Sequence, residues 1–364
     1  MRRIGIVKES APGERRVAIT PDSVAHLRAA GLEVLVETRA GEAAFFPDSM
    51  YGQAGAEIVD ADELYARADI VACVDRPPAA RLRPGTFVVG LLRPDPAYLA
   101  ELAARGVTAA SLDRVPRTIS AAQPMDAVTS QENVAGYRAA VVAAHAYERF
   151  FPLLVTAAGT ARPAKVLVLG AGVAGLAAIG TARRLGAVVT GYDVRPAARE
   201  EIASLGANVL DLHGEGGEGE GGYARAQTDE QQQAEQDELA AQIGRQDVVI
   251  TTARVPGRRP PLLVTEAAVK QLRPGSVIVD LAAGPLGGNV EGSRPDETVV
   301  TGDGVTVIGA GNLPATMPAA ASTAYAHNVR AFLGHVLRDG ELALDPADEI
   351  QRAVIVAGLP GGAA

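Results

Sequence analysis

The stretch Lys165–Gly175, KVLVLGAGVAG, decides the fold class of this 364-residue chain. Its first five residues are Lys, Val and Leu, and such a short apolar run is typical of a strand buried on both faces. A glycine-rich turn follows at once, and the Ala-rich segment after it contains no proline, which predicts a helix. A strand, a tight turn and a helix in this order indicate a parallel sheet covered by helices.

Strand-like and helix-like segments alternate on both sides of this stretch. On its N-terminal side we expect helices at 20–30, 62–67 and 97–105, and strands at 4–7, 33–37, 70–74, 86–91 and 107–112. From Lys165 onward we expect strands at 165–169, 188–192, 208–210, 247–251, 276–280 and 305–308, and a helix at 223–243. Long helices are expected at about 130–151 and 318–337.

This order predicts an α/β fold with two Rossmann-like, doubly wound parallel-sheet domains joined by long helices. We expect the last long helix to return to the first domain, which makes that domain discontinuous. The predicted domains comprise residues 1–128 plus 313–364 and residues 129–312.

Composition narrows the function classes. Aromatic residues make up 4% of the chain and Trp is absent, which disfavours a surface that stacks nucleobases. The formal net charge of −9 also disfavours a phosphate backbone, so no nucleic acid partner is expected. The single cysteine, Cys73, excludes an internal disulfide framework and suits a reducing cytoplasm. The five histidines show no metal-ligand spacing, so no metal site is expected.

No segment is expected to direct secretion or to cross a membrane. The N-terminus lacks the apolar run of a signal peptide. The uncharged run 166–182 is shorter than the ~20 residues that span a bilayer, and glycines interrupt it. We therefore expect a soluble chain.

Each glycine of the turn has a physical role in binding a dinucleotide. Gly170 permits the tight turn, Gly172 lets a pyrophosphate approach the backbone, and Gly175 allows the helix to pack closely on the strand. The first helical turn, which contains Ala174, supplies free N–H groups and a positive partial charge for phosphate. Because a strand precedes the motif and a helix follows it, the motif predicts a dinucleotide site.

The strand after this turn ends at Asp193, 18 residues beyond Gly175. An acid at this place accepts hydrogen bonds from the adenosine ribose and repels a 2′-phosphate, which favours NAD(H) as the cofactor. Arg195 leaves NADP(H) open, because an arginine near this point can hold a 2′-phosphate. A Rossmann-like domain that binds no nucleotide is the other alternative.

Acid–base residues of the kind that a typical dehydrogenase places beside its substrate carbon are missing. The polar, loop-borne residues Arg117, Gln123 and Asp126 precede the first long helix and are the candidate catalytic residues, with an ordinary turn as the alternative. A reaction that moves only a hydride between two nicotinamides needs no proton transfer at the carbon. It needs two rings in contact with water excluded.

The segment 213–222, HGEGGEGEGG, alternates Gly with Glu and cannot bury a core. It has two interpretations, a tolerated acidic insertion or a loop that moves over a bound ligand.

Motifs spread over most of the chain resemble those of one family, the NAD(H)-binding component of proton-translocating nicotinamide nucleotide transhydrogenase. The resemblance covers about residues 3–337. It rests on GERRVAITP (13–21), VPR (115–117), NVAGYR (133–138), VTAAGT (155–160), PAKVLVLG (163–170), LGAVV (185–189), DVR (193–195), TTA (251–253) and VPG (255–257).

Alanine dehydrogenase shares this fold and the first motif, but the chain resembles it less where its chemistry lies. The segment 73–77, CVDRP, stands where that family carries a substrate lysine just before a proline, and Arg93 stands in the segment 91–94 that carries its catalytic histidine. Its aspartate after 280–282 is also missing, since Ala283 follows there. Arg16 is retained.

The resemblance assigns roles to individual residues. Val173, Asp193 and Arg195 are implied to contact the adenosine half of NAD. Arg117, Gln123, Asp126 and Thr129 are implied to shape the nicotinamide end, and the glutamine also reaches the partner nucleotide. Other implied cofactor-binding positions are Ala253 and, in the loop that closes over NAD, Gly222 and Tyr223.

The resemblance also implies partners. It predicts hydride transfer from NADH to NADP(H) held on a partner subunit, coupled to proton movement through membrane-spanning subunits. A homodimer is expected, cytoplasmic and peripheral to the inner membrane through those subunits. The chain departs from the family at a longer 117–123 interval, at Arg254, at 284–286 and at 310–312. A non-catalytic NAD-binding module, such as a sensor or a diverged paralogue, therefore stays open beside an alanine dehydrogenase-type enzyme.

Overall fold

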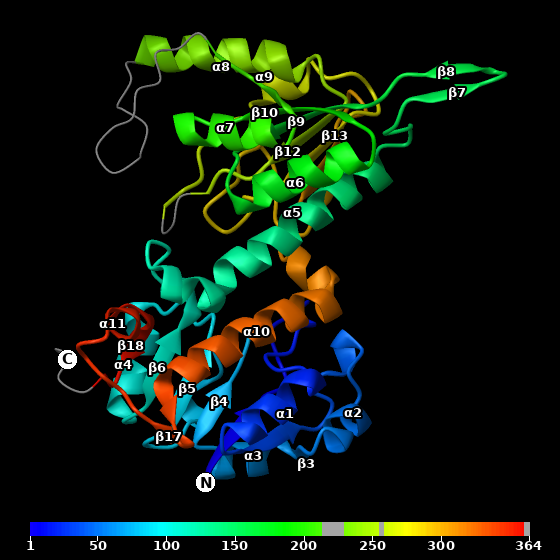
Figure 1. Ribbon diagram of the computed structural model, residues 1–364. Coiled ribbons are helices and arrows are strands. Elements are labelled where there is room, and N and C mark those ends of the chain that lie inside the picture. Colours follow the sequence, from blue (N-terminus) through cyan, green and yellow to red (C-terminus); the bar gives the residue numbers. More distant parts are fainter. Residues whose placement is uncertain (213–228, 255–257, 360–364) are drawn as a thin grey trace. The chain divides into compact units, whose positions relative to one another are not determined.

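The computed structural model describes residues 1–212, 229–254 and 258–359, and its chain divides into two compact units. Unit 1 comprises Met1–Gln131 and Pro314–Ala364, and unit 2 comprises Glu132–Leu313. The chain leaves unit 1 inside helix α5 (Ala127–Ala146) and returns shortly before helix α10 (Pro318–Val336), as Figure 1 shows.

Unit 1 is built on a seven-stranded sheet in the order β18-β6-β5-β4-β1-β2-β3. All neighbouring strands are parallel except β18, which runs antiparallel to β6. The strands are β1 (Arg2–Ile6), β2 (Leu32–Glu37), β3 (Glu57–Val59), β4 (Ile70–Ala72), β5 (Phe87–Gly90), β6 (Thr108–Ser111) and β18 (Ile355–Ala357). The order reverses between β1 and β4, which makes the carboxyl ends of these two strands the topological switch point.

Helices cover both faces of this sheet. They are α1 (Pro21–Ala29), α2 (Asp48–Gln53), α3 (Ala61–Arg67), α4 (Pro96–Ala104), α10 and α11 (Glu349–Val354). Short 3-10 helices lie between them at η1 (Glu42–Ala44), η2 (Ala79–Arg81), η3 (Leu112–Arg114) and η4 (Ser120–Met125), and a small ladder joins β16 (Leu337–Arg338) to β17 (Glu341–Leu342).

Unit 2 has the same order of parallel strands, within the sheet β11-β10-β9-β12-β13-β15-β14, but its edge strand β14 precedes its neighbour in sequence, whereas β18 of unit 1 comes last. Its edge strand β14 is again antiparallel to its neighbour, and the other pairs are parallel. The switch point lies between β9 and β12. The strands are β9 (Lys165–Leu169), β10 (Val188–Tyr192), β11 (Asn208–Val209), β12 (Val248–Thr251), β13 (Val277–Asp280), β14 (Thr298–Val300) and β15 (Thr306–Gly309). Its helices are α6 (Val173–Arg184), α7 (Pro196–Ser204), α8 (Asp229–Ile243) and α9 (Glu266–Val269), and η5 (Leu313–Thr316) follows.

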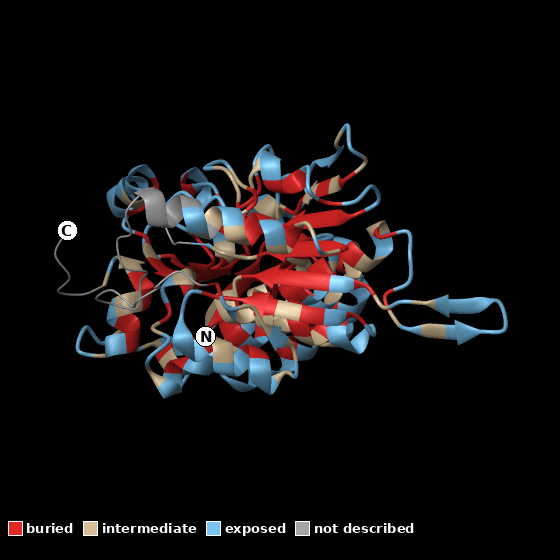
Figure 2. Ribbon diagram, turned by 90° about the horizontal axis from the view of Figure 1, so that it is seen from above, coloured by how far each residue is buried: buried red, intermediate tan, exposed pale blue. Residues whose placement is uncertain are grey.

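The sheet of unit 2 is packed on helices through small side chains. Ala139, Ala140 and Ala143 of α5 are fully buried in one cluster with Ala178 and Ala182 of α6. In Figure 2 the strands are mostly buried, whereas the outer faces of the helices are exposed. Small residues let the helix backbones lie close to one another, so the low aromatic content of the chain reflects this close packing.

A two-stranded hairpin projects from unit 2, formed by β7 (Leu154–Thr156) and β8 (Gly159–Ala161) (Figures 1 and 2). Val155 on the hairpin is 73% exposed, and Leu153 and Phe150 before it are 57% and 58% exposed. Isolated hairpins of this size are only marginally stable in water. Because these apolar side chains are exposed, the described residues of unit 2 leave much of the hairpin without packing contacts.

The expected α/β fold with two parallel-dominated sheets is confirmed, and β9 and β10 lie where the sequence predicts them. The first long helix begins at Ala127 rather than 130, because Asp126 caps it, and ends at Ala146 rather than 151. The sequence analysis did not anticipate α2, β3, the β7–β8 hairpin, α7, β14 or β18. Residues 223–228 of the helix expected at 223–243 lie outside the described residues.

In the described ranges, no helix combines the length and the apolar character required to cross a membrane.

Gly136 gives a test of the close packing of α5 on α6. A Cβ atom built at Gly136 would lie 2.0 Å from the Ala174 carbonyl oxygen, a backbone atom that cannot turn aside. We expect Gly136→Ala to lower the free energy of unfolding by about 2 kcal/mol, measured by urea denaturation, since overpacking costs ~1–3 kcal/mol. Gly52→Ala is the matched control, because Gly52 is also helical and faces open space, and its stability should stay equal or rise slightly. Equal stabilities for the two variants would contradict the packing described for unit 2.

Candidate dinucleotide-binding site

The glycine turn of unit 2 lies at the switch point, directly after β9. Gly170 has a φ of +96°, a conformation that side chains disfavour, and its N–H donates to the Tyr192 carbonyl at 2.9 Å. A Cβ atom on Gly170 would also lie 2.6 Å from the Thr252 hydroxyl. Glycine is therefore required here by both the backbone conformation and the contact with the loop after β12.

Gly172 and Gly175 differ in the reason for which they are glycine. A Cβ atom on Gly175 would lie 1.9 Å from the Gly170 carbonyl oxygen, so helix α6 could not pack on the turn with any larger residue. A Cβ atom on Gly172 would meet nothing within 4 Å, and its φ of −73° is one that every residue adopts. The fold of unit 2 therefore does not require glycine at 172, which points to a ligand that approaches the backbone there.

Helix α6 begins at Val173 with Gly172 at its N-cap, and no side chain caps it. Ala174 lies in its first turn, so the leading N–H groups of α6 lie at the carboxyl edge of the sheet. Unsatisfied N–H groups and the helix dipole at such a position suit a phosphate group.

Asp193 lies directly after β10 and is 8% exposed. Its carboxylate accepts hydrogen bonds from the Ala171 N–H at 2.7 Å, the Arg195 N–H at 2.9 Å, and the Arg195 guanidinium at 3.0 and 3.1 Å. Burial acts to raise the pKa of Asp193, but the Arg195 and Ala171 donors outweigh it and hold the pKa below its usual value. The carboxylate is thus ionised at neutral pH and ties the glycine turn to the start of α7.

The Arg195 side chain pairs with this carboxylate and is also 46% exposed to solvent. Its hydrogen bond to Asp193 raises the pKa of the guanidinium. The four donors around Asp193 occupy the acceptor positions of its two oxygens. A ribose hydroxyl that bound here would therefore contact a hydrogen-bonded Asp193–Arg195 pair and not a free carboxylate.

A second polar group supports the site from the neighbouring strands. The fully buried Asp280 carboxylate accepts from the Thr251 hydroxyl and the Ala282 N–H, both at 2.9 Å, and from the Val290 N–H at 3.2 Å. The buried Asn289 amide donates to the Ala253 carbonyl at 2.9 Å.

These contacts fix the loop after β12 that carries Ala253, and the Thr252 hydroxyl in this loop donates to the Gly170 carbonyl at 2.9 Å. The sequence analysis missed Asp280, Asn289 and Thr252 as supporting residues. Asp280 and Thr252 were signalled only by a polar residue at or directly after an apolar strand, and Asn289 had no such signal.

The candidate nicotinamide-end residues lie in unit 1, from the turn before η4 to the first turn of α5. Asp126 precedes α5, and its carboxylate accepts from the Thr129 N–H at 2.8 Å and the Thr129 hydroxyl at 2.6 Å, the geometry of a helix N-cap. The Arg117 guanidinium forms an ion pair with the same carboxylate at 3.4 Å. Gln123 is exposed in η4, and its carbonyl accepts from the Asp126 N–H.

The structure therefore brings the predicted residues together in two groups. Unit 1 holds Arg117, Gln123, Asp126 and Thr129, and unit 2 holds the glycine turn with Val173, Ala174, Asp193, Arg195 and Ala253. Gly222 and Tyr223 lie outside the described residues. Arg254, one of the departures from the family, donates to the Leu281 carbonyl. Among the described residues, no three His, Cys, Asp or Glu side chains are grouped to hold a metal ion.

The lysine, histidine and aspartate that alanine dehydrogenases are expected to carry are missing from the segments 73–77, 91–94 and 283–285. Cys73 is fully buried, its thiol donates to the Val89 carbonyl at 3.4 Å, and burial raises the pKa of that thiol well above its ordinary value. Arg93 is exposed and Ala283 is apolar. None of these three side chains can exchange a proton with a substrate at neutral pH.

The topology of the two sheets and the glycine turn define a protein with two Rossmann-like units, one of which has the features of a dinucleotide site. Comparisons with known proteins agree with this class. The alanine dehydrogenase/PNT N-terminal domain matches residues 5–135, and the alanine dehydrogenase/PNT C-terminal domain matches residues 139–358. The chain therefore belongs to the alanine dehydrogenase/PNT family.

Within this family the chain is similar to transhydrogenase alpha subunits. It is 45% identical to the NAD(P) transhydrogenase subunit alpha of Cereibacter sphaeroides, over 97% of this chain and 69% of that protein. It is 40% identical to the NAD(P) transhydrogenase subunit alpha of Haemophilus influenzae, over 97% of this chain and 70% of that one. The crystal structure of transhydrogenase from Sinorhizobium meliloti superposes with a TM-score of 0.89 at 40% identity, covering 98% and 99% of the two chains. The predicted resemblance is confirmed.

The contrast between Gly172 and Gly175 predicts different outcomes for two similar substitutions. We expect Gly172→Ala to unfold at the wild-type temperature. It should bind NADH about tenfold more weakly, a loss of ~1.4 kcal/mol in binding free energy, because its methyl group would stand where the pyrophosphate approaches. Gly175→Ala should lower the melting temperature, because its methyl group would meet backbone. Fluorescence titration with NADH and thermal unfolding measure the two effects. Unchanged NADH affinity in Gly172→Ala would mean that no dinucleotide binds at this turn.

Proposed function

We propose that this chain is the NAD(H)-binding subunit of a proton-translocating transhydrogenase. It binds NADH and presents the nicotinamide to NADP+ held on a partner subunit, and a hydride passes directly between the two rings. The single observation that carries the proposal is Gly172, a glycine that the fold does not need, at the switch point of a unit in which Asp193 directly follows the next strand.

The absence of the alanine dehydrogenase lysine, histidine and aspartate from the matching segments supports direct hydride transfer. Reductive amination needs an acid or a base beside the substrate carbon, whereas transfer between two nicotinamides requires only contact between the rings and exclusion of water. The residues that would take part are Arg117, Gln123 and Asp126, with Thr129, at the nicotinamide end. The residues that would hold NAD are Gly170, Gly172, Val173, Ala174, Gly175, Asp193, Arg195, Ala253, Gly222 and Tyr223.

The electrostatics of the Asp193–Arg195 pair support NAD(H) on this subunit. The ionised Asp193 carboxylate would repel a 2′-phosphate, and Arg195 is already engaged with that carboxylate. NADP(H) is therefore assigned to the partner subunit. Coupling to proton movement would occur in membrane-spanning subunits, to which this chain would bind at the cytoplasmic face.

A mixing experiment tests the proposal. The chain alone should bind NADH but show no turnover with NADP+, because the acceptor ring has no site on it. Adding the NADP(H)-binding subunit of the same complex should restore rapid hydride transfer, measured by stopped-flow absorbance. Gln123→Ala should lower this transfer rate about tenfold or more, because misplaced rings lose the orientation that direct transfer needs.

Two other results would replace the proposal. NADH oxidation by the chain alone with pyruvate and ammonia would indicate an alanine dehydrogenase, the other activity in the family name. Tight NADH binding without transfer to the cognate partner would indicate a non-catalytic NAD-binding module, which the altered 117–123 interval leaves open.

We infer in addition that the chain forms a homodimer, in which the β7–β8 hairpin packs on a second copy. The apolar side chains of Phe150, Leu153 and Val155 are more than half exposed, although they lie on or next to a hairpin too small to be stable alone. A symmetric dimer buries such side chains on both copies at once.

A charge on the hairpin tests the dimer. We expect Val155→Asp to convert the dimer into a monomer in light scattering coupled to size exclusion, because the carboxylate would be buried in the interface. Val300→Asp is the matched control, since Val300 is 65% exposed on the edge strand β14, an element separate from the hairpin. A Val155→Asp variant that remains dimeric would show that the hairpin is not the interface.

A further inference from the structure

The segment that carries the nicotinamide-end residues is held from beneath by a side chain of α10. Asn328 is 7% exposed, and its Nδ2 donates to the Pro124 carbonyl at 2.8 Å. Its Oδ1 accepts from the Ser130 hydroxyl at 2.6 Å. Pro124 directly follows Gln123, and Ser130 directly follows Thr129. One buried amide therefore joins both ends of the 123–130 segment.

Both polar groups of this amide are used, which fixes its orientation. The Pro124 carbonyl lies inside the 3-10 helix η4, and the donor that it receives comes from a residue 204 positions away in the sequence. Without that donor the carbonyl would lose its bond, and η4 could turn relative to α5. Gln123 would turn with it, because its side chain is exposed and its backbone is one peptide bond from Pro124.

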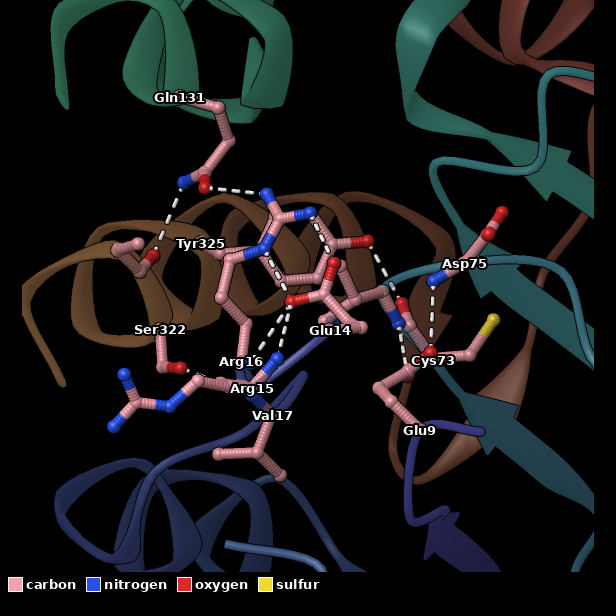
Figure 3. A network of polar contacts seen from close by, with 12 residues as sticks. Glu9, Glu14, Arg15, Arg16, Val17, Cys73, Asp75, Gln131, Ser322 and Tyr325 are labelled. Atoms are coloured by element: carbon pink, nitrogen blue, oxygen red, sulfur yellow. Dashed lines mark hydrogen bonds and ion pairs between the residues drawn. The ribbon is translucent and has the colours of Figure 1, made fainter. Parts of the chain in front are cut away.

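A second set of contacts holds Gln131, the residue directly after this segment, as Figure 3 shows. The Arg16 guanidinium donates to the Gln131 side-chain oxygen at 2.8 Å, and the Gln131 amide donates to the Ala321 carbonyl of α10 at 3.0 Å. Arg16 is 5% exposed, and the Glu14 carboxylate accepts two of its N–H groups at 2.8 and 2.6 Å. The start of α5 is thus immobilised, so a change at Asn328 is expected to act on η4 rather than on the helix.

We propose that Asn328 is a positioning residue for hydride transfer, which acts on the nicotinamide through η4 and Gln123. The inference rests on the proposed function. Direct transfer between two rings depends on their separation and alignment, and a displacement of about 1 Å can cost ~100-fold in rate. Asn328 is buried, and its hydrogen bonds go to Ser130 and to the Pro124 carbonyl, neither of which is a predicted ligand-binding side chain, so its effect is transmitted through the Pro124 carbonyl.

The test uses Asn328→Asp in the complex with the NADP(H)-binding subunit. The aspartate keeps the size of the side chain and the acceptor for Ser130, but it places an oxygen against the Pro124 carbonyl. We expect the single-turnover rate of hydride transfer to fall about 10- to 100-fold, while the NADH dissociation constant changes less than about twofold. Thr323→Ala, at an exposed position on the same helix, is the control and should transfer at the wild-type rate.

A double-mutant cycle separates positioning from a general structural role. If Asn328 acts through Gln123, the change Asn328→Asp should cost no further rate in the Gln123→Ala background. Additive losses, or a wild-type rate in folded Asn328→Asp, would overturn the inference. Asn328→Ala, which introduces no charge, carries the same test if the aspartate variant does not fold. Absence of transfer in the wild-type complex would refute the proposed function instead, so the two failures are distinguishable.

Discussion

The contact between Gly175 and the Gly170 carbonyl is the constraint on which unit 2 depends. A single methyl group at residue 175 would lie 1.9 Å from that oxygen, so α6 can leave the turn in this direction only if residue 175 has no side chain. The direction of α6 places its N-terminus at the carboxyl edge of β9. Asp193 then holds the turn through the Ala171 N–H, and Thr252 holds it through the Gly170 carbonyl. Backbone and side chains on three strands thus converge on one turn.

Unit 1 has the same order of parallel strands as unit 2, but a protein side chain lies at its switch point in place of a glycine turn. The loop after β1 contains no such glycine turn, and the Glu9 carboxylate accepts from the N–H groups of Val74 and Asp75, which follow β4. Burial raises the pKa of Glu9 to about 7, although these two N–H groups act in the opposite direction and the neighbouring Glu14 and Asp75 charges add to the rise. A protein carboxylate therefore occupies the backbone donors at this switch point. The same order of parallel strands does not imply identical ligands, because the loops decide what the switch point can bind.

The sequence predicted those features that depend on local chemistry. The apolar run KVLVL directly before the glycine turn indicated a buried strand, and both β9 and β10 lie at the residues that the sequence predicts. The β7–β8 hairpin was not predicted. Val155 in the hairpin and Leu153 before it are exposed, but valine and leucine are typical core residues, and nothing in the local sequence shows that these two lack a packing partner. Its stability depends on contacts outside its own sequence.

The candidate site was predictable only where one motif contains it. The glycine turn and Asp193 could be found because their spacing is characteristic. Asn289 and Asn328 act on Ala253 and Pro124 over 36 and 204 positions, and no local pattern marks such contacts. The start of α5 was misplaced for a related reason, since a turn aspartate and a helix-capping aspartate look the same until the Thr129 N–H is seen to bond it.

Within each unit, the carboxylates among the candidate residues and their supporting residues are engaged in ways that agree with the proposed hydride transfer. Asp126 caps α5 and pairs with Arg117, Asp193 accepts four donors, and Asp280 accepts three while fully buried. Each is engaged as a fixed acceptor, and a general base must instead release its partners to take up a proton. A rigid arrangement of this kind within each unit would keep the groups that contact a bound nucleotide at constant positions. That is the requirement of a reaction whose only moving atom is a hydride, and it makes the residues that hold η4 and the glycine turn in place as important as those that touch the nucleotide.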